Sequence, residues 1–351
     1  MTAGRRGPHP WLDGVTRVRH GGGAAAGLLD LSASLAPLGP SPRALAAARA
    51  ADPVGYPAAD AGPLVAAAAP LLGVGAERLV PGPGAAELLL RTALAHLGPG
   101  DTLLAVGPCF GEYRRAAAAC GARTVRWEAC PQDGFALDPA AVAAAARRSG
   151  AVLGVLARPQ NPTGVLTPVE AVAELVERTP AVTWVVDEAF VGLCDDPRST
   201  AGTEVVTVRS LTKELGLAGL RVGVADAPPR VARALRALAP PWCVSAPAIA
   251  AAVAGLGDHG HRSATLEAVR AGRAALVTAL RDLGLEVADA AANYVCTEVR
   301  AATRFTARMA AEGVAVRDCT DLGLPGWVRL AVPPPSELEW VVEALRRVVL
   351  A

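Results

Sequence analysis

The sequence predicts an α/β protein with a mostly parallel central sheet and a second, smaller α+β unit. Short apolar runs alternate with Ala-rich helical stretches between about residues 101 and 225, which is typical of a parallel sheet with helices on both faces. After about residue 240 the order changes to long helical stretches, three strands and a closing helix. The length of 351 residues exceeds one ordinary domain, so we expect two units that share a cleft.

The elements of the first unit are expected to alternate along the chain. Buried strands are predicted over residues 102–106, 123–127, 152–156, 183–186, 205–208 and 222–225, with helices over 112–120, 139–148 and 168–177. The second unit is predicted to contain helices over 246–256 and 263–283, strands near 293–298, 314–317 and 327–332, and a helix over 336–350. We expect an N-terminal arm (1–45) that joins the small domain, a large domain (46–240) and a small C-terminal domain (241–351).

Composition argues against several classes of protein. Hydrophobic residues make up 52% of the chain, but Pro and Gly interrupt them before any run of about 18 apolar residues, so no membrane span is expected. The net charge is +1 with both signs mixed, which leaves no basic surface for nucleic acid. The seven cysteines are widely spaced without a C-x-x-C pair, which argues against a disulfide framework or a zinc site. No export signal is apparent, so we expect a cytoplasmic protein.

One lysine, Lys213, stands among the 34 basic residues. A coding bias towards Arg explains why other lysines are absent. The amine of Lys can be neutral and nucleophilic and can form an imine, which Arg cannot do. Lys213 follows a predicted buried strand instead of lying on an exposed helix face, and ligands of parallel sheets bind at the carboxyl ends of the strands. We therefore expect Lys213 to be functional.

Polar residues accompany Lys213 at the ends of the predicted strands. Ser210 lies three residues before it and Arg221 eight residues after it, and both can bind an anion such as a phosphate. Asp187 ends a neighbouring strand, and a turn after a third strand presents Asn161. The segment 81–88 opens a helix with small residues, which leaves backbone N–H groups free for an anion. Each signal is weak alone, but their order and spacing together are specific.

This order of an anion loop, an aromatic residue, Asn, Asp, Ser-x-x-Lys and Arg resembles the fold type I pyridoxal-phosphate enzymes of the class I/II aminotransferase family, from about residue 20 to 330. The resemblance implies a homodimer with shared active sites, an amino-acid substrate and pyridoxal phosphate bound by the large domain. It implies that Lys213 carries the cofactor as an imine, and that Asp187 pairs with the pyridinium nitrogen. Asn161 would donate to the 3′-oxygen of the ring.

The resemblance also assigns the remaining cofactor contacts. It implies that the ring stacks on Phe110 and that the phosphate is held by the backbone at Ala85 and Ala86, by Ser210 and Arg221, and by Tyr56 of the partner subunit. Arg329 matches the arginine that binds the substrate α-carboxylate. Phe190 stands where many aminotransferases have a tyrosine that donates to the 3′-oxygen. Loss of that donor is expected to raise the pKa of the imine.

Segments 20–22, 30–40 and 316–320 resemble the threonine-phosphate decarboxylases of cobalamin biosynthesis, whose nearest cousins are the histidinol-phosphate aminotransferases. This implies that His20 approaches the substrate phosphoryl group, unless it is an ordinary loop histidine, and that Arg317 is a second cation near the substrate carboxylate. The chain departs from this group in two places. Ser34 and Ala36 occupy the positions of two asparagines in a substrate loop, and residues 333–335 are prolines where another arginine is usual. A smaller or less charged amino acid therefore becomes a credible substrate.

The favoured function is a decarboxylase-like enzyme acting at Cα, with a class I/II aminotransferase of the histidinol-phosphate type as the alternative. The reaction depends on which Cα bond stands perpendicular to the ring, which the sequence leaves open; Lys213 can serve as the base that moves a proton. A non-catalytic regulator with this fold would carry an N-terminal helix-turn-helix domain, for which the first 40 or so residues are too few. A nicotinamide enzyme would need G-x-G-x-x-G after the first strand, and this motif is absent.

Overall fold

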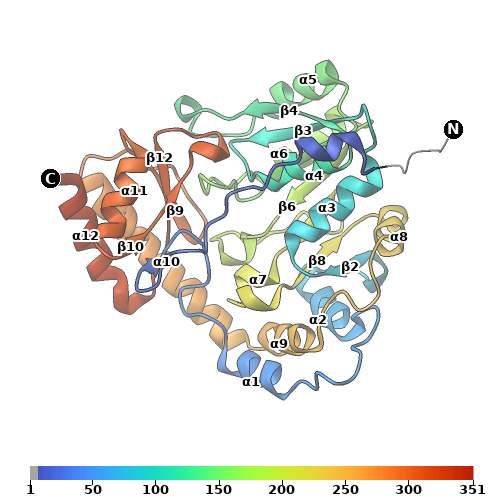
Figure 1. The fold of residues 1–351 in the computed structure, drawn as a ribbon, viewed down its shortest axis with the longest axis horizontal. Coiled ribbons are helices and arrows are strands. Elements are labelled where there is room, and N and C mark those ends of the chain that lie inside the picture. The colour runs from blue at the N-terminus through green and yellow to red at the C-terminus, as the bar shows by residue number, and fades with distance from the viewer. Residues whose placement is uncertain (1–6, 351) are drawn as a thin grey trace.

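A seven-stranded sheet forms the centre of the molecule in the computed structural model, which describes residues 7–350 (Figure 1). Its order is β2-β8-β7-β6-β5-β3-β4. The strands are β2 (Leu79–Gly82), β3 (Thr102–Gly107), β4 (Arg123–Glu128), β5 (Leu153–Ala157), β6 (Thr183–Asp187), β7 (Val206–Arg209) and β8 (Gly223–Asp226). The pairs from β4 to β7 are parallel, whereas β8 is antiparallel to both of its neighbours. The predicted mostly parallel sheet is confirmed.

The six predicted strands of this sheet are present with each end within one residue of its predicted position. The sequence missed β2, a short strand that contains Pro81 and Gly82. Proline cannot donate a ladder hydrogen bond, and β2 can contain it because it lies at the sheet edge and pairs with β8 alone. The prediction that β4 is buried was wrong: β4 is the opposite edge strand, and its residues are exposed or partly exposed.

Helices cover both faces of this sheet because alternate strand residues point to opposite sides. On one face, α3 (Ala85–His96), α4 (Glu112–Ala119) and α8 (Pro229–Ala237) pack against residues such as Val155 and Val185. On the other face, α5 (Pro139–Ser149) and α6 (Val169–Arg178) pack against Leu156 and Val186, which follow Val155 and Val185 in the strands. A further apolar cluster joins α1 (Pro42–Ala50), α2 (Gly62–Leu72) and α9 (Ala246–Leu256).

The second unit has an antiparallel sheet in the order β11-β12-β9. Its elements are β9 (Tyr294–Glu298), α11 (Ala302–Ala311), β11 (Arg317–Asp318), β12 (Trp327–Ala331) and α12 (Leu338–Leu350). The 24-residue helix α10 (His259–Asp282) runs from beside α9 into this unit (Figure 1). The strand predicted over 314–317 is interrupted, because β10 (Val314–Ala315) leaves the sheet to pair with β1 (Leu29–Asp30).

The N-terminal segment contacts both units. β1 pairs in parallel with β10 of the second unit, as expected for an arm that joins it. A short helix η1 (Pro10–Gly14) instead packs on α4, where the indole N–H of Trp11 donates to the carbonyl of Ala119 at 3.3 Å. The segment between these elements crosses the front of the large sheet (Figure 1). The domain boundaries at residues 45 and 240 stay predictions.

The strands β5, β6 and β7 lie side by side and end at the same edge of the sheet. The turn that carries Asn161 follows β5, Asp187 ends β6, and Lys213 follows β7. The fold thereby places three polar groups from distant parts of the sequence at one edge. Within residues 7–350, every helix is too short or too polar to span a bilayer.

Candidate functional site

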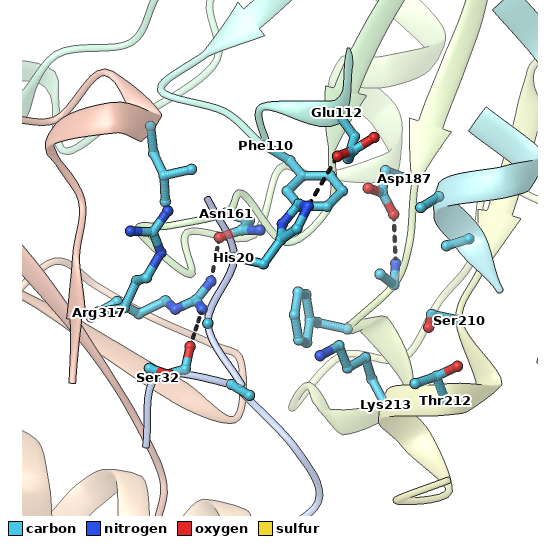
Figure 2. Close-up of a pocket in the computed structure, with 18 of the residues that line it drawn as sticks. His20, Ser32, Phe110, Glu112, Asn161, Asp187, Ser210, Thr212, Lys213 and Arg317 are labelled. Carbon is cyan, nitrogen blue, oxygen red and sulfur yellow. Dashed lines mark hydrogen bonds and ion pairs between the residues drawn. The ribbon is translucent and has the colours of Figure 1, made fainter. Parts of the chain in front are cut away.

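A pocket with a volume of about 430 Å³ lies at the carboxyl edge of the parallel strands and faces the second unit (Figure 2). Its lining includes most of the residues that the sequence assigned to the site: His20, Ala85, Ala86, Phe110, Asn161, Asp187, Ser210, Lys213, Arg221, Arg317 and Arg329. The sheet edge supplies the groups expected to hold the cofactor. The N-terminal segment and strands β11 and β12 supply the groups expected at the substrate.

Lys213 lies in the short helix α7 (Leu211–Glu214) directly after β7. Its amine is positioned over the ring of Phe190, with 5.7 Å between Nζ and the ring centroid. Burial lowers the pKa of the Lys213 amine to about 8, and the positive charges of Arg329 and Arg221 act in the same direction. A substantial fraction of the amine is therefore neutral in mildly alkaline solution and available as a nucleophile or a base.

Asp187 is a buried carboxylate without a cationic partner among the described residues. The hydroxyl of Tyr113 donates to Oδ2 at 2.8 Å, and the backbone N–H of Ala189 donates to Oδ1 at 3.1 Å. Burial raises the pKa of Asp187 to about 6 in spite of these two hydrogen bonds. A protonated ring nitrogen would supply the missing opposite charge, so Asp187 fits the pyridinium of pyridoxal phosphate.

The N-terminus of α3 forms an anion cradle. Gly84 precedes the helix with φ +95°, and no side chain caps the first turn. The first N–H groups of a helix lack intrahelical partners, so those of Ala85 and Ala86 can bind a phosphate. A Cβ at position 84 would lie 2.6 Å from Nη2 of Arg221, so glycine is what allows this guanidinium to approach the helix. Ser210 and Thr212 line the same side (Figure 2).

Arg329 on β12 is held in place by neutral groups. Its Nη1 donates to Oδ1 of Asn161 at 2.5 Å, and its Nη2 donates to the carbonyl of Ser32 at 2.8 Å. Its guanidinium also lies 5.2 Å from the ring centroid of Tyr294. The buried Nε has no hydrogen-bond partner among the described residues. The bond to Asn161 orients the amide so that its NH₂ group is left for another acceptor.

His20 and Arg317 reach the pocket already bound to carboxylates. His20 Nε2 lies 3.0 Å from Oε1 of Glu112, and its ring centroid is 5.5 Å from that of Phe110. Nη2 of Arg317 lies 2.8 Å from each oxygen of Asp321. His20 lines the pocket, and whether it approaches a substrate phosphoryl group or is an ordinary loop histidine stays a prediction.

Two predicted residues do not line this pocket. Ser34 is fully buried, and Ser32 and Ala33 line the pocket in its place, so a contact of Ser34 with the substrate stays a prediction that this geometry does not support. The backbone of Leu31 fixes this arrangement. Its N–H donates to the carbonyl of Ala315, and its carbonyl accepts from the N–H of Ala331, so that the two residues after Leu31 lie against the pocket. Tyr56 is 82% exposed and stacks on Trp242, with 4.5 Å between the ring centroids. Its role in a partner subunit stays a prediction.

Sequence reasoning missed several groups at the site. Nothing in the sequence indicated that the hydroxyl of Tyr113 reaches Asp187, 74 positions later. Glu112 gave no signal because its partner His20 lies 92 positions earlier. Ser32, Thr212 and Asp321 also went unassigned. Only Thr212 had a usable local signal, because it adjoins Lys213.

Comparison with known proteins gives a consistent result. Residues 27–345 match the family described as aminotransferase class I and II. A histidinol-phosphate aminotransferase of Symbiobacterium thermophilum is 36% identical over 328 residues, which cover 91% of this chain and 90% of the relative. A second one, from Cupriavidus pinatubonensis, is 34% identical and covers 92% of this chain and 88% of the relative. The structure of histidinol-phosphate aminotransferase from Sinorhizobium meliloti in complex with pyridoxal-5′-phosphate superposes with a TM-score of 0.83 at 26% identity, covering 91% of this chain and 90% of that one.

Proposed function

The chain belongs to the class I and II aminotransferase family, and from this premise we propose that it transfers an amino group between an amino compound and a keto acid. Its cofactor is pyridoxal phosphate. The observation that carries the proposal is the buried amine of Lys213, with its pKa lowered to about 8, in one pocket with Asp187 and the anion cradle. The relatives favour this alternative over the decarboxylase that the sequence segments suggested.

We assign the cofactor contacts to the residues that fit each part of it. Lys213 is the attachment point, and Asp187 holds the ring nitrogen. Asn161 offers its amide NH₂ to the 3′-oxygen while its oxygen stays bound to Arg329. Phe110 lies against the ring. The backbone at Ala85 and Ala86 holds the phosphate together with the side chains of Ser210 and Arg221.

The protein groups then have separate tasks in the reaction. Bound pyridoxal phosphate supplies an electron sink for the pair released at Cα. Arg329 binds the substrate carboxylate through the part of its guanidinium that the chain leaves open. With the cofactor and substrate bound, the amine of Lys213 would be the base that takes the proton from Cα. Tyr113 keeps the carboxylate of Asp187 oriented and favours its charged form.

A test with two substrate sets distinguishes the two reactions. In the first set the holoenzyme receives an amino donor and 2-oxoglutarate, with L-histidinol phosphate among the donors because it is the substrate that the relatives' names indicate. In the second it receives O-phospho-L-threonine alone. The proposal predicts glutamate formation that depends on 2-oxoglutarate. Release of carbon dioxide without a keto acid would instead support the decarboxylase.

A further inference from the structure

Two arginines face the substrate end of the pocket from adjacent strands. Arg317 on β11 and Arg329 on β12 are cross-strand partners, and both side chains are buried, with 6% exposure each. Both line the pocket. Two guanidinium groups in one pocket would suit an anion with two charges. The two arginines differ, however, in what already neutralises them.

The charge of Arg329 is open, which here means that no carboxylate of the described residues neutralises it. The groups that contact it are an amide oxygen, a backbone carbonyl and an aromatic ring, none of which is ionised. No carboxylate within residues 7–350 forms an ion pair with it. Its Nε is buried and unpaired among the same residues. An unpaired buried donor is unfavourable until a ligand accepts from it, so Arg329 is prepared for an incoming anion.

Arg317 has no such open charge. Asp321 accepts from Nη2 at 2.8 Å, and the same nitrogen donates to the carbonyl of Arg19 at 3.0 Å. Nη1 donates to the carbonyl of Asp318 at 2.7 Å. Asp321 therefore already neutralises Arg317 from beside the pocket, since Arg317 lines the pocket and Asp321, with 40% of its side chain exposed, does not. Because Asp321 lies only four residues after Arg317 in the chain, it competes with a ligand as an intramolecular partner.

The other cationic groups at this end do not replace Arg317. Glu112 binds both His20 and Arg115, with 2.5 Å to Nε of Arg115, so one buried carboxylate serves two basic groups. Arg19 is exposed at the rim, where solvent screens its charge. Among the described residues that line this end of the pocket, Arg329 is thus the buried cation without a carboxylate partner.

From this charge arrangement we propose that the substrate anion is a single carboxylate, so that the amino donor is an unphosphorylated α-amino acid, and that Asp321 is the residue that sets this specificity. This inference rests on the proposed aminotransferase function. A phosphate monoester carries about two negative charges near pH 8. Arg329 alone would be free to bind it, because the carboxylate of Asp321 already forms an ion pair with Arg317. A carboxylate needs only Arg329, with which it can form two parallel hydrogen bonds.

The test compares two unreactive probes of equal chain length, n-butyrate and n-propyl phosphate. Their binding to the cofactor-loaded protein is measured by titration calorimetry near pH 8, in wild type, Asp321→Asn and Asp321→Ser. We expect wild type to bind butyrate at least as tightly as propyl phosphate. Each variant should bind propyl phosphate about ten-fold more tightly while butyrate changes by less than about two-fold. The serine variant covers the case in which the asparagine variant fails to fold.

Two controls isolate the effect. Glu343→Gln removes an equal charge from the outer helix α12, where Glu343 pairs with Arg346, and should leave both affinities unchanged. Adding Arg317→Gln to Asp321→Asn should abolish the gain for propyl phosphate. The idea fails if wild type prefers propyl phosphate by about ten-fold or more, if neither Asp321 variant changes the ratio, or if neither probe binds.

The same holoenzymes separate this inference from the function on which it rests. Wild type should transaminate at least one α-amino acid with a kcat/KM about ten-fold or more above that for L-histidinol phosphate. Higher activity with L-histidinol phosphate would contradict the inference and leave the aminotransferase function standing. If no amino donor reacts in the presence of any keto acid, the proposed function fails, whereas the ratio of probe affinities still decides the role of Asp321.

Discussion

At the scale of single residues, the main electrostatic feature is a buried carboxylate that the protein does not neutralise. The pKa of Asp187 is raised from 3.8 to about 6, chiefly by burial. An acid whose pKa is raised on folding destabilises the folded state when it is ionised. This loss of folding free energy is absent below about pH 3.8 and fully present above about pH 6. We propose that the charge that destabilises the protein without cofactor is the one that would hold the cationic ring nitrogen.

Replacing Asp187 by Asn should therefore separate stability from cofactor binding. Without cofactor at pH 8, we expect Asp187→Asn to unfold with a free energy higher than wild type by up to roughly 3 kcal/mol, because the penalty of two pKa units disappears. The gain should shrink as the pH falls through 6 towards 3.8. The same variant should bind pyridoxal phosphate more weakly. Urea unfolding across pH and cofactor titration measure both. A variant less stable than wild type at pH 8 would contradict this account.

The contacts between residues divide into those that the sequence could predict and those that it could not. Lys213, Asp187 and Asn161 were predictable because each lies at the end of a strand with a clear apolar pattern or within four residues after it, and strand ends meet at one edge. The bonds from Tyr113 to Asp187 and from His20 to Glu112 join segments far apart in the chain. Such pairings depend on how helices and the N-terminal segment pack, which local pattern does not encode.

At the scale of elements, the turn that carries Lys213 is anchored to the helix that links the two units. Glu214, the neighbour of Lys213, accepts from Arg209 of β7 and from Arg262 of α10, each at 2.7 Å. Glu214 and Arg209 are almost fully buried, with 4% of each side chain exposed. Removal of one member of a buried ion pair leaves the others uncompensated, which is strongly destabilising. This cluster fixes α7 between the sheet and α10.

We expect Glu214→Gln to lower the free energy of unfolding by about 3 kcal/mol or more. The matched control is Glu174→Gln on α6, whose ion pair with Arg178 is half exposed on both sides. That change should cost less than about 0.5 kcal/mol. Chemical denaturation of both variants in parallel makes the comparison. Equal effects of the two changes would show that the cluster around Glu214 has no special structural role.

An apolar pattern predicts that a strand is present, but it predicts neither the direction of the strand nor its partner. The apolar run that became β8 marks a strand but not its direction, because parallel and antiparallel neighbours both bury it. The break between β10 and β11 arises because β1 pairs with β10. The local sequence around Val314 does not indicate that its partner is Leu29, which lies almost 300 residues earlier in the chain.

At the scale of the whole molecule, Tyr56 belongs to a group of exposed apolar side chains. Tyr56 and Val54 are 82% and 90% exposed, and Tyr56 stacks on the partly exposed Trp242. Large apolar side chains gathered at a surface often mark an interface. We propose that this region packs on a partner subunit, as the family resemblance implies, and that Tyr56 reaches the partner's cofactor phosphate.

Sedimentation of the purified protein at micromolar concentration should therefore give a dimer. Tyr56→Phe keeps the ring and removes only the hydroxyl, so it should leave the dimer intact and weaken pyridoxal phosphate binding several-fold, by the loss of one hydrogen bond to a charged group. A monomeric wild type, or a Tyr56→Phe variant with unchanged cofactor affinity, would be evidence against the shared site.

The most direct test of the account is the visible absorption of the purified protein after addition of pyridoxal phosphate. Lys213 is the attachment point in this account, and the chain has no other lysine to substitute for it. Wild type should gain a visible band that an amino donor bleaches and a keto acid restores. Lys213→Arg, which keeps the charge but cannot form an imine, should show no band. A wild type that stays colourless, or an arginine variant that keeps the band and its response to substrates, would contradict the central claim.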